Sequence, residues 1–134
     1  MRAIFGADRF TSGEIEVFGQ KAAFKTPGQA IKAGNTVYCS GQIGLDPATG
    51  TMVEGVVAQA NRAFDNLEAV LAQAGAKMTD VVKFTIFLTD INDFSQVNEV
   101  MAAHVPTPYP ARSCMQVAAL PKGALVEVEA IAVI

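Results

Sequence analysis

The stretch Val81-Val82-Lys83-Phe84-Thr85-Ile86-Phe87-Leu88-Thr89 decides the fold of this chain. It is the strongest strand signal in the sequence, because apolar and polar side chains alternate along it. The face predicted to be apolar carries Val82, Phe84, Ile86 and Leu88. The face predicted to point the other way carries Lys83, Thr85 and Thr89. A helical pattern lies on each side of this strand, so we expect a sheet covered by helices.

Residues 57–74 predict one long amphipathic helix before this strand. Apolar residues recur at helical spacing, at Val57, Ala60, Ala63, Phe64, Leu67, Val70, Leu71 and Ala74. The opposite face is expected to carry Gln59, Arg62, Asp65, Asn66 and Gln73. Gly75 is placed to cap the C-terminus of this helix.

A second helix is predicted after the strand. Asp93 and Gln96 have the spacing of a capping box, which predicts that the helix begins here, and Pro106 ends it. Its predicted apolar face carries Phe94, Val97, Val100, Met101 and Val105. We expect both helices to lie on the same face of the sheet.

Strand-like segments at both ends complete the pattern. They are residues 15–18, 29–32 and 36–40, and about 112–118 and 125–133. Turns are predicted at 33–35 and 46–50. The order of strands, helix, strand, helix and strands predicts one α+β domain over residues 1–134, in which a mixed sheet carries two helices on one face.

The composition predicts an oligomer that does not grip nucleic acid. Hydrophobic residues make up 51% of the chain and charged residues only 17%, so some apolar surface is expected to be buried between subunits. The net charge of -3 and the absence of any Lys or Arg run argue against nucleic-acid binding. No apolar run approaches the roughly 18–20 residues that span a bilayer. With no signal-peptide pattern at the N-terminus, the expected location is cytoplasmic.

The residues that bind metals are scarce. Cys39 and Cys114 lack C-x-x-C spacing, and His104 is the single histidine. We therefore expect no metal site and two free thiols. His104 is expected to be a satisfied core or interface histidine.

An arginine and a glutamate inside strand-like segments mark the candidate site. Arg112 lies in Pro110-Ala111-Arg112-Ser113-Cys114, and Glu127 lies in Val126-Glu127-Val128-Glu129. Each charge costs several kcal/mol in an apolar strand unless it finds a partner. Arg suits bidentate binding of a carboxylate, so the pattern favours a pocket for a small acid.

Strand alternation does not decide how Arg112 and Glu127 lie relative to each other. It places Arg112, Cys114 and Gln116 on one face. If the two closing strands pair, Arg112 and Glu127 flank one cavity. The alternative is an ion pair of Arg112 with Glu127 or Glu129 that only closes an interface. Cys114 is by default a small buried hydrophobe, because no base lies near it in sequence.

A longer pattern surrounds these residues. It comprises Pro110-Ala111-Arg112-Ser113-Cys114, Val117-Ala118-Ala119-Leu120-Pro121-Lys122-Gly123 and Val126-Glu127-Val128-Glu129-Ala130-Ile131-Ala132-Val133. Upstream it includes Ser40-Gly41-Gln42-Ile43, Asp46-Pro47-Ala48-Thr49-Gly50, Ala74-Gly75, Asp90-Ile91-Asn92-Asp93-Phe94 and Val97-Asn98. Over residues 29–134 the chain closely resembles the RidA family, the reactive-intermediate (enamine/imine) deaminases.

The resemblance implies a chorismate-mutase-like α+β domain that assembles as a homotrimer with clefts at the subunit interfaces. It implies hydrolysis of 2-aminoacrylate-type enamines and 2-imino acids to 2-keto acids and ammonia, a form of metabolite detoxification. No metal or organic cofactor is implied.

The resemblance also suggests a role for each site residue. Arg112 clamps the substrate carboxylate, and Glu127 holds or activates the attacking water. The main chain at Cys114 bonds the substrate nitrogen or the water. Ser40 and Gly41 line the cleft, with Asn98 on its facing side.

One segment departs from the family pattern. Members usually carry a Gly-Pro-Tyr segment before the first hairpin, and here the matching place reads Phe24-Lys25-Thr26-Pro27. Residues 1–28 as a whole are atypical, so we expect this segment to reshape the pocket and to alter the substrate preference. The alternative function is a non-enzymatic module that binds a small carboxylate in the same cleft. A ribonuclease is the weakest reading, because the chain is acidic and has no basic patch.

Overall fold

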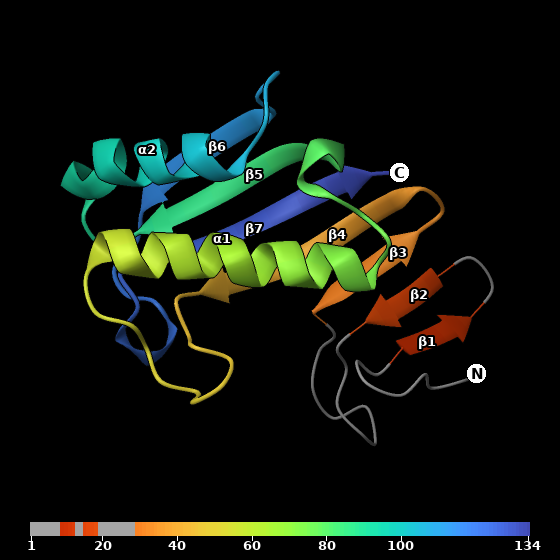
Figure 1. Ribbon diagram of the computed structural model, residues 1–134, viewed down its shortest axis with the longest axis horizontal. Helices are drawn as coiled ribbons and strands as arrows, with labels where there is room; N and C mark the ends of the chain where they lie inside the picture. The colour runs from red at the N-terminus through yellow and green to blue at the C-terminus, as the bar shows by residue number, and fades with distance from the viewer. Residues whose placement is uncertain (1–8, 13–14, 19–28) are drawn as a thin grey trace.

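The computed structural model describes residues 9–12, 15–18 and 29–134, and for residues 9–12 the backbone alone (Figure 1). The atypical segment around Phe24-Lys25-Thr26-Pro27 lies outside the described residues. The strands are β1 (Arg9–Ser12), β2 (Ile15–Phe18), β3 (Ala30–Ala33), β4 (Thr36–Ile43), β5 (Val81–Leu88), β6 (Ala111–Gln116) and β7 (Val126–Val133). The helices are α1 (Val56–Gln73) and α2 (Phe94–His104), with short 3₁₀ turns η2 (Met78–Asp80), η3 (Ile91–Asp93) and η4 (Pro121–Gly123).

These strands form a single mixed sheet in the order β1-β2-β3-β4-β7-β5-β6. Strands β5 and β6 are parallel, and every other neighbouring pair is antiparallel. The parallel pair requires a crossover, which α2 provides. Both helices lie on the same face of the sheet (Figure 1). The predicted α+β architecture is therefore confirmed.

The core lies between the helices and that face. Phe64 of α1 and Phe84 of β5 are fully buried and meet edge to face, with ring centroids 5.7 Å apart. Such aromatic pairs stabilise by about 0.5–1.5 kcal/mol beyond the area they bury. This contact fixes which side of β5 faces the helices, and the strands beside β5 inherit that orientation through their register.

The predicted apolar face of β5 is wrong at its first position. Val82 is 46% exposed, whereas Val81 is buried. The pairing with β7 shifts register between Val81 and Lys83, so one extra residue enters β5 there. Such a bulge turns the following side chains over. From Phe84 onward the predicted alternation holds.

The predicted polar face of α1 is also wrong in part. Gln59 is only 4% exposed, and Asn66 is half-buried. Both side chains point toward the sheet, where they bond backbone groups. Conversely, Val57 was expected on the apolar face and is exposed. The end of the helix is as predicted, since Gly75 has a φ of 79° and the amide of Ala76 donates to the carbonyl of Leu71.

The start of α2 differs from the predicted capping box. Asp93 makes no side-chain capping bond, and the turn η3 precedes the helix. Asp90 accepts a hydrogen bond from the amide of Asn92 at 2.9 Å, so this earlier aspartate caps the whole segment. The apolar face of α2 is as predicted, because Val97, Val100 and Met101 are buried.

The other face of the sheet is not covered by any described element. Several large apolar side chains are exposed there, namely Ile31, Tyr38, Met115 and Val133. Exposed apolar surface of this kind is typical of an interface between subunits.

Candidate active site

Arg112 lies on β6, the edge strand of the sheet, and faces the helices. In the parallel register it sits beside Phe84, whose ring packs on α1. Its guanidinium donates from Nη1 to Oδ1 of Asn98 and lies over the ring of Phe94, 4.8 Å from the centroid. Both partners belong to α2. The guanidinium is thus held from one side, while the residue stays exposed to a ligand.

A second contact fixes α2 against this strand. The side chain of Gln116 accepts a hydrogen bond from the amide of Ile91 at 2.9 Å. Gln116 is on the same face of β6 as Arg112, so it ties the turn η3 to the strand. The position of Phe94 and Asn98 relative to Arg112 follows from this tether.

Cys114 lies between Arg112 and Gln116 and packs partly against the core. Burial raises the pKa of its thiol, and the neighbouring charge of Arg112 only partly offsets this effect. Burial also raises the pKa of the Cys39 thiol, to about 12. Both cysteines are free, as predicted, and a protonated thiol is a poor nucleophile.

Glu127 lies on β7 and points to the uncovered face of the sheet. Its neighbours in the register are Ile43 on β4 and Phe87 on β5, and the flanking residues Val126 and Val128 are buried beneath the helices. Loss of hydration, followed by repulsion from Glu129, raises the pKa of the Glu127 carboxyl. A carboxyl group with a raised pKa is suited to proton transfer.

Gly41 makes room for the Glu127 side chain. A Cβ at this position would lie 2.6 Å from both Cδ and Oε2 of Glu127. Ser40 is next to it and exposed, and its hydroxyl donates to the carbonyl of Gln29 at 3.1 Å. The predicted residues Ser40, Gly41 and Glu127 therefore occupy one region.

The predicted site residues form two groups on opposite faces of the sheet. Arg112, Asn98 and Cys114 are on the helix-covered face, whereas Glu127 and Gly41 are on the uncovered face. The hypothesis that the two closing strands pair is wrong, because β5 lies between β6 and β7. Arg112 of one chain consequently does not share a cavity with Glu127 of the same chain.

The interface ion pair proposed as an alternative is not formed within the chain either. Arg112 bonds Asn98, and neither Glu127 nor Glu129 has a salt bridge to it. His104 is satisfied as predicted, since its ring stacks on Phe64 and its Nε2 lies 2.9 Å from Oδ1 of Asn61. Within the described ranges, no three His, Cys, Asp or Glu side chains gather as a metal site.

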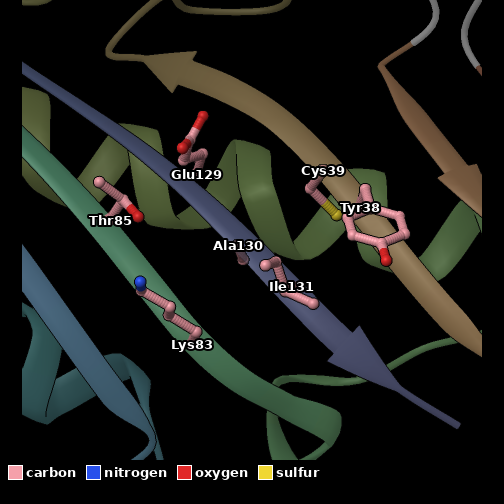
Figure 2. Close-up of a pocket in the computed structure, with 7 residues that line it drawn as sticks. All are labelled: Tyr38, Cys39, Lys83, Thr85, Glu129, Ala130 and Ile131. Atoms are coloured by element: carbon pink, nitrogen blue, oxygen red, sulfur yellow. The ribbon is translucent and has the colours of Figure 1, made fainter.

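A hollow of about 310 Å³ lies on the uncovered face of the sheet. Figure 2 shows the residues that line it, with α1 visible behind the sheet. The hollow is lined by Tyr38, Cys39, Lys83, Thr85, Glu129, Ala130 and Ile131. None of the predicted site residues lines this hollow. Its importance for the site is indirect, because Glu129 raises the pKa of nearby Glu127.

Three residues make contacts that the sequence patterns did not predict. Phe94 was assigned to the apolar face of α2, and it also stacks under Arg112. Gln59 and Asn66 were assigned to the polar face of α1. The spacing from Gln59 to Ala63, Asn66 and Val70 is four, three and four residues, which is a single helical stripe and was the available signal.

Residues 21–134 match the model of the family described as Endoribonuclease L-PSP, to which the RidA proteins belong. This chain is a member of the RidA family. It is 50% identical over 113 residues to the 2-iminobutanoate/2-iminopropanoate deaminase of Capra hircus, covering 84% of this chain and 82% of the goat protein.

Two solved structures of RidA-family proteins are similar to this chain. RidA from an Antarctic Psychrobacter bacterium is 52% identical, with a TM-score of 0.80, covering 86% of this chain and 94% of that one. TdcF of E. coli, solved with bound serine, is 40% identical, with a TM-score of 0.76, covering 86% and 93%. These likenesses place the chain among the RidA proteins in fold as well as in sequence.

Proposed function

We propose that this RidA-family protein hydrolyses reactive 2-enamine and 2-imino acids of the 2-aminoacrylate type to 2-keto acids and ammonia, without a cofactor. Relatives about 50% identical to it over most of the chain are named 2-iminobutanoate/2-iminopropanoate deaminases. The observation that carries the proposal is the environment of the Arg112 guanidinium. Its guanidinium is held by Asn98 and Phe94, yet it is open to a ligand carboxylate.

Arg112 is proposed to bind the substrate carboxylate with two charge-assisted hydrogen bonds. Because Asn98 and Phe94 already orient the guanidinium, little side-chain freedom is lost when the substrate binds. This anchors the imine carbon, which lies one bond from the carboxylate, at a fixed place. The main chain at Cys114, on the same strand, is proposed to bond the substrate nitrogen or the water.

Glu127 is proposed to act on the water. Its carboxylate accepts one proton from the water as the water oxygen bonds to the carbon of the protonated imine, which produces a carbinolamine. Glu127 passes this proton to the nitrogen. The C–N bond then breaks as the carbinolamine hydroxyl gives its proton to Glu127, which leaves a 2-keto acid, and this proton departs with ammonia as ammonium. The raised pKa of the Glu127 carboxyl suits it both to accept a proton and to give it back. An imine carbon is electrophilic, so no covalent nucleophile is required.

The site is proposed to form between two chains of a homotrimer, which provides three interface clefts. Within one chain the Arg112 group and the Glu127 group face opposite sides of the sheet. A neighbouring chain seated on the uncovered face supplies the missing half, and it also buries the exposed apolar residues there. Cleft-lining roles for Ser40 and Gly41 belong to the same proposal, as does a cytoplasmic location.

Release of ammonia and keto acid from 2-aminoacrylate generated in situ tests the activity. Wild type should accelerate hydrolysis, and Arg112→Ala and Glu127→Ala should each abolish the acceleration. No acceleration by clean, oligomeric wild type would contradict the proposal. In that case saturable keto-acid binding that depends on Arg112 would favour the binding module, a reading that the serine-bound structure of TdcF also supports.

Mixing the two inactive variants tests the shared site. If Arg112 and Glu127 of neighbouring chains cooperate, equal amounts unfolded and refolded together should regain about one quarter of wild-type activity, because random assembly restores that share of the sites. A site built within one chain predicts no recovery. RNA cleavage that survives Arg112→Ala and rigorous purification would instead support the endoribonuclease that the family description names.

A further inference from the structure

Gln59 is the only buried residue among the polar and charged residues that the structure describes. Its Oε1 accepts a hydrogen bond from the backbone amide of Leu125 at 2.8 Å. Leu125 stands just before β7 and two residues before Glu127. The carbonyl of Leu125 in turn accepts from the amide of Thr89 at the end of β5. The start of β7 is therefore held from the helix and from the neighbouring strand.

Asn66, two helical turns farther along α1, holds the other strand. Its Nδ2 donates to the carbonyl of Ile43 at 3.0 Å and to the carbonyl of Leu45 at 2.9 Å. Ile43 ends β4 and is the register partner of Glu127. The two hydrogen bonds hold β4 at the level of the Glu127 side chain.

Just beyond Ile43, a glycine lets the chain lie close to α1. A Cβ on Gly44 would lie 2.7 Å from Cα of Gln59, so only glycine lets this segment approach the helix so closely. The two amide side chains and this glycine bring α1, the end of β4 and the start of β7 together. Burial of an amide costs free energy unless it is bonded, so these groups fix one arrangement.

We propose that Gln59 and Asn66 are positioning residues for the proposed reaction, which hold β7 and β4 from one face of α1 so that Glu127 stays seated against Gly41. The inference rests on the proposed role of Glu127. Neither side chain touches the uncovered face, and both act through the backbone. A displacement of about 1 Å at a reacting group costs on the order of a hundred-fold in rate, so small losses of register have a large effect.

Substitutions that keep the size of the side chain separate a positioning role from a packing role. They can do so because Gln59 accepts a hydrogen bond, whereas Asn66 donates two. Gln59 acts as an acceptor, so Gln59→Glu should keep the bond and most of the activity, while Gln59→Met should lose both. Asn66 acts as a donor, so Asn66→Asp should fail as badly as Asn66→Leu. Gln73→Met makes the same chemical change as Gln59→Met on the same helix, away from β4 and β7, and serves as the matched control.

Three quantities are measured in variants that keep wild-type circular dichroism. Gln59→Met and Asn66→Leu should lower kcat by about ten-fold or more, since lost alignment slows the proton transfer. They should leave the affinity for a 2-keto acid within about two-fold, since Arg112 binds it on the other face. The pKa of the Glu127 carboxyl, measured by carbon NMR, should fall toward its ordinary value as the carboxylate gains hydration.

Unchanged kcat and unchanged Glu127 pKa in both variants would overturn the inference, as would an equal loss in the Gln73→Met control. The NMR measurement needs no turnover. If wild type lacks deaminase activity, the proposed function fails, and the pKa of Glu127 in the variants still decides the positioning role.

Discussion

The carboxylate of Glu127 occupies the space that a side chain on residue 41 would need. A Cβ built on Gly41 comes within 2.6 Å of Cδ and Oε2 of Glu127. This contact joins β4 to β7 at the uncovered face, where Glu127 is half-buried. The glycine therefore sets the position of the carboxylate by leaving room for it.

Gly41→Ala should reduce kcat/KM by about ten-fold or more, because the new methyl group forces Glu127 out of its place. The carboxylate is the flexible end of a side chain, so the protein should still fold, with a loss of stability of about 1–3 kcal/mol. Steady-state kinetics and thermal unfolding measure the two effects. In a Glu127→Ala background, where no carboxylate competes for the space, the same substitution should cost little stability, and an undiminished loss of stability would contradict the contact.

Glu129→Gln should move the acid limb of the kcat/KM profile to lower pH. Glu127 must be ionised to accept a proton, and repulsion from Glu129 is the second cause of its raised pKa. Removing that charge lowers the pKa of Glu127, so the active carboxylate persists at lower pH. The measurement is kcat/KM from about pH 4 to 8, the range around ordinary and raised carboxyl pKa values.

The matched control is Glu68→Gln, since Glu68 is exposed on α1. Its acid limb should coincide with that of wild type. An acid limb that stays in place in Glu129→Gln would show that Glu129 does not influence the catalytic carboxyl.

Asn98→Leu should raise KM more than it lowers kcat. The variant removes the acceptor for Arg112 Nη1, and a hydrogen bond to a charged group contributes about 1.5–3 kcal/mol, so substrate affinity should fall by about ten-fold. Initial rates over a range of substrate concentration separate the two constants. Gln96→Leu changes an exposed amide on the same helix and should leave KM unaltered.

Cys114→Ala should retain most of the activity, because the proposed contact comes from the main chain of β6. The raised pKa of both thiols predicts slow reaction with a disulfide reagent at pH 8. Absorbance of the released thiol should show fast labelling of two groups only after denaturant is added. Rapid labelling of native protein together with loss of activity in Cys114→Ala would point to a catalytic thiol.

Most elements of this fold follow from local sequence patterns. Alternation in β5 and helical spacing in α1 and α2 predicted these three elements, whereas no pattern predicted β1. Such patterns predict only whether each residue is buried or exposed, and they do not predict which distant residues it contacts. They fail at Val82, where one extra residue shifts the register, and at Gln59, where a buried amide bonds a distant backbone group.

The sequence by itself singled out Arg112 and Glu127, the residues proposed to carry the chemistry, since an arginine and a glutamate in apolar strands require partners. Only the tertiary structure decided which residues lie next to Arg112 and Glu127. Insertion of β5 between β6 and β7 separates Arg112 from Glu127 and turns them to opposite faces. Strand order depends on contacts between distant segments, which no local pattern records. That is why the single-chain cavity expected from alternation gives way to two groups of residues on opposite faces of the sheet.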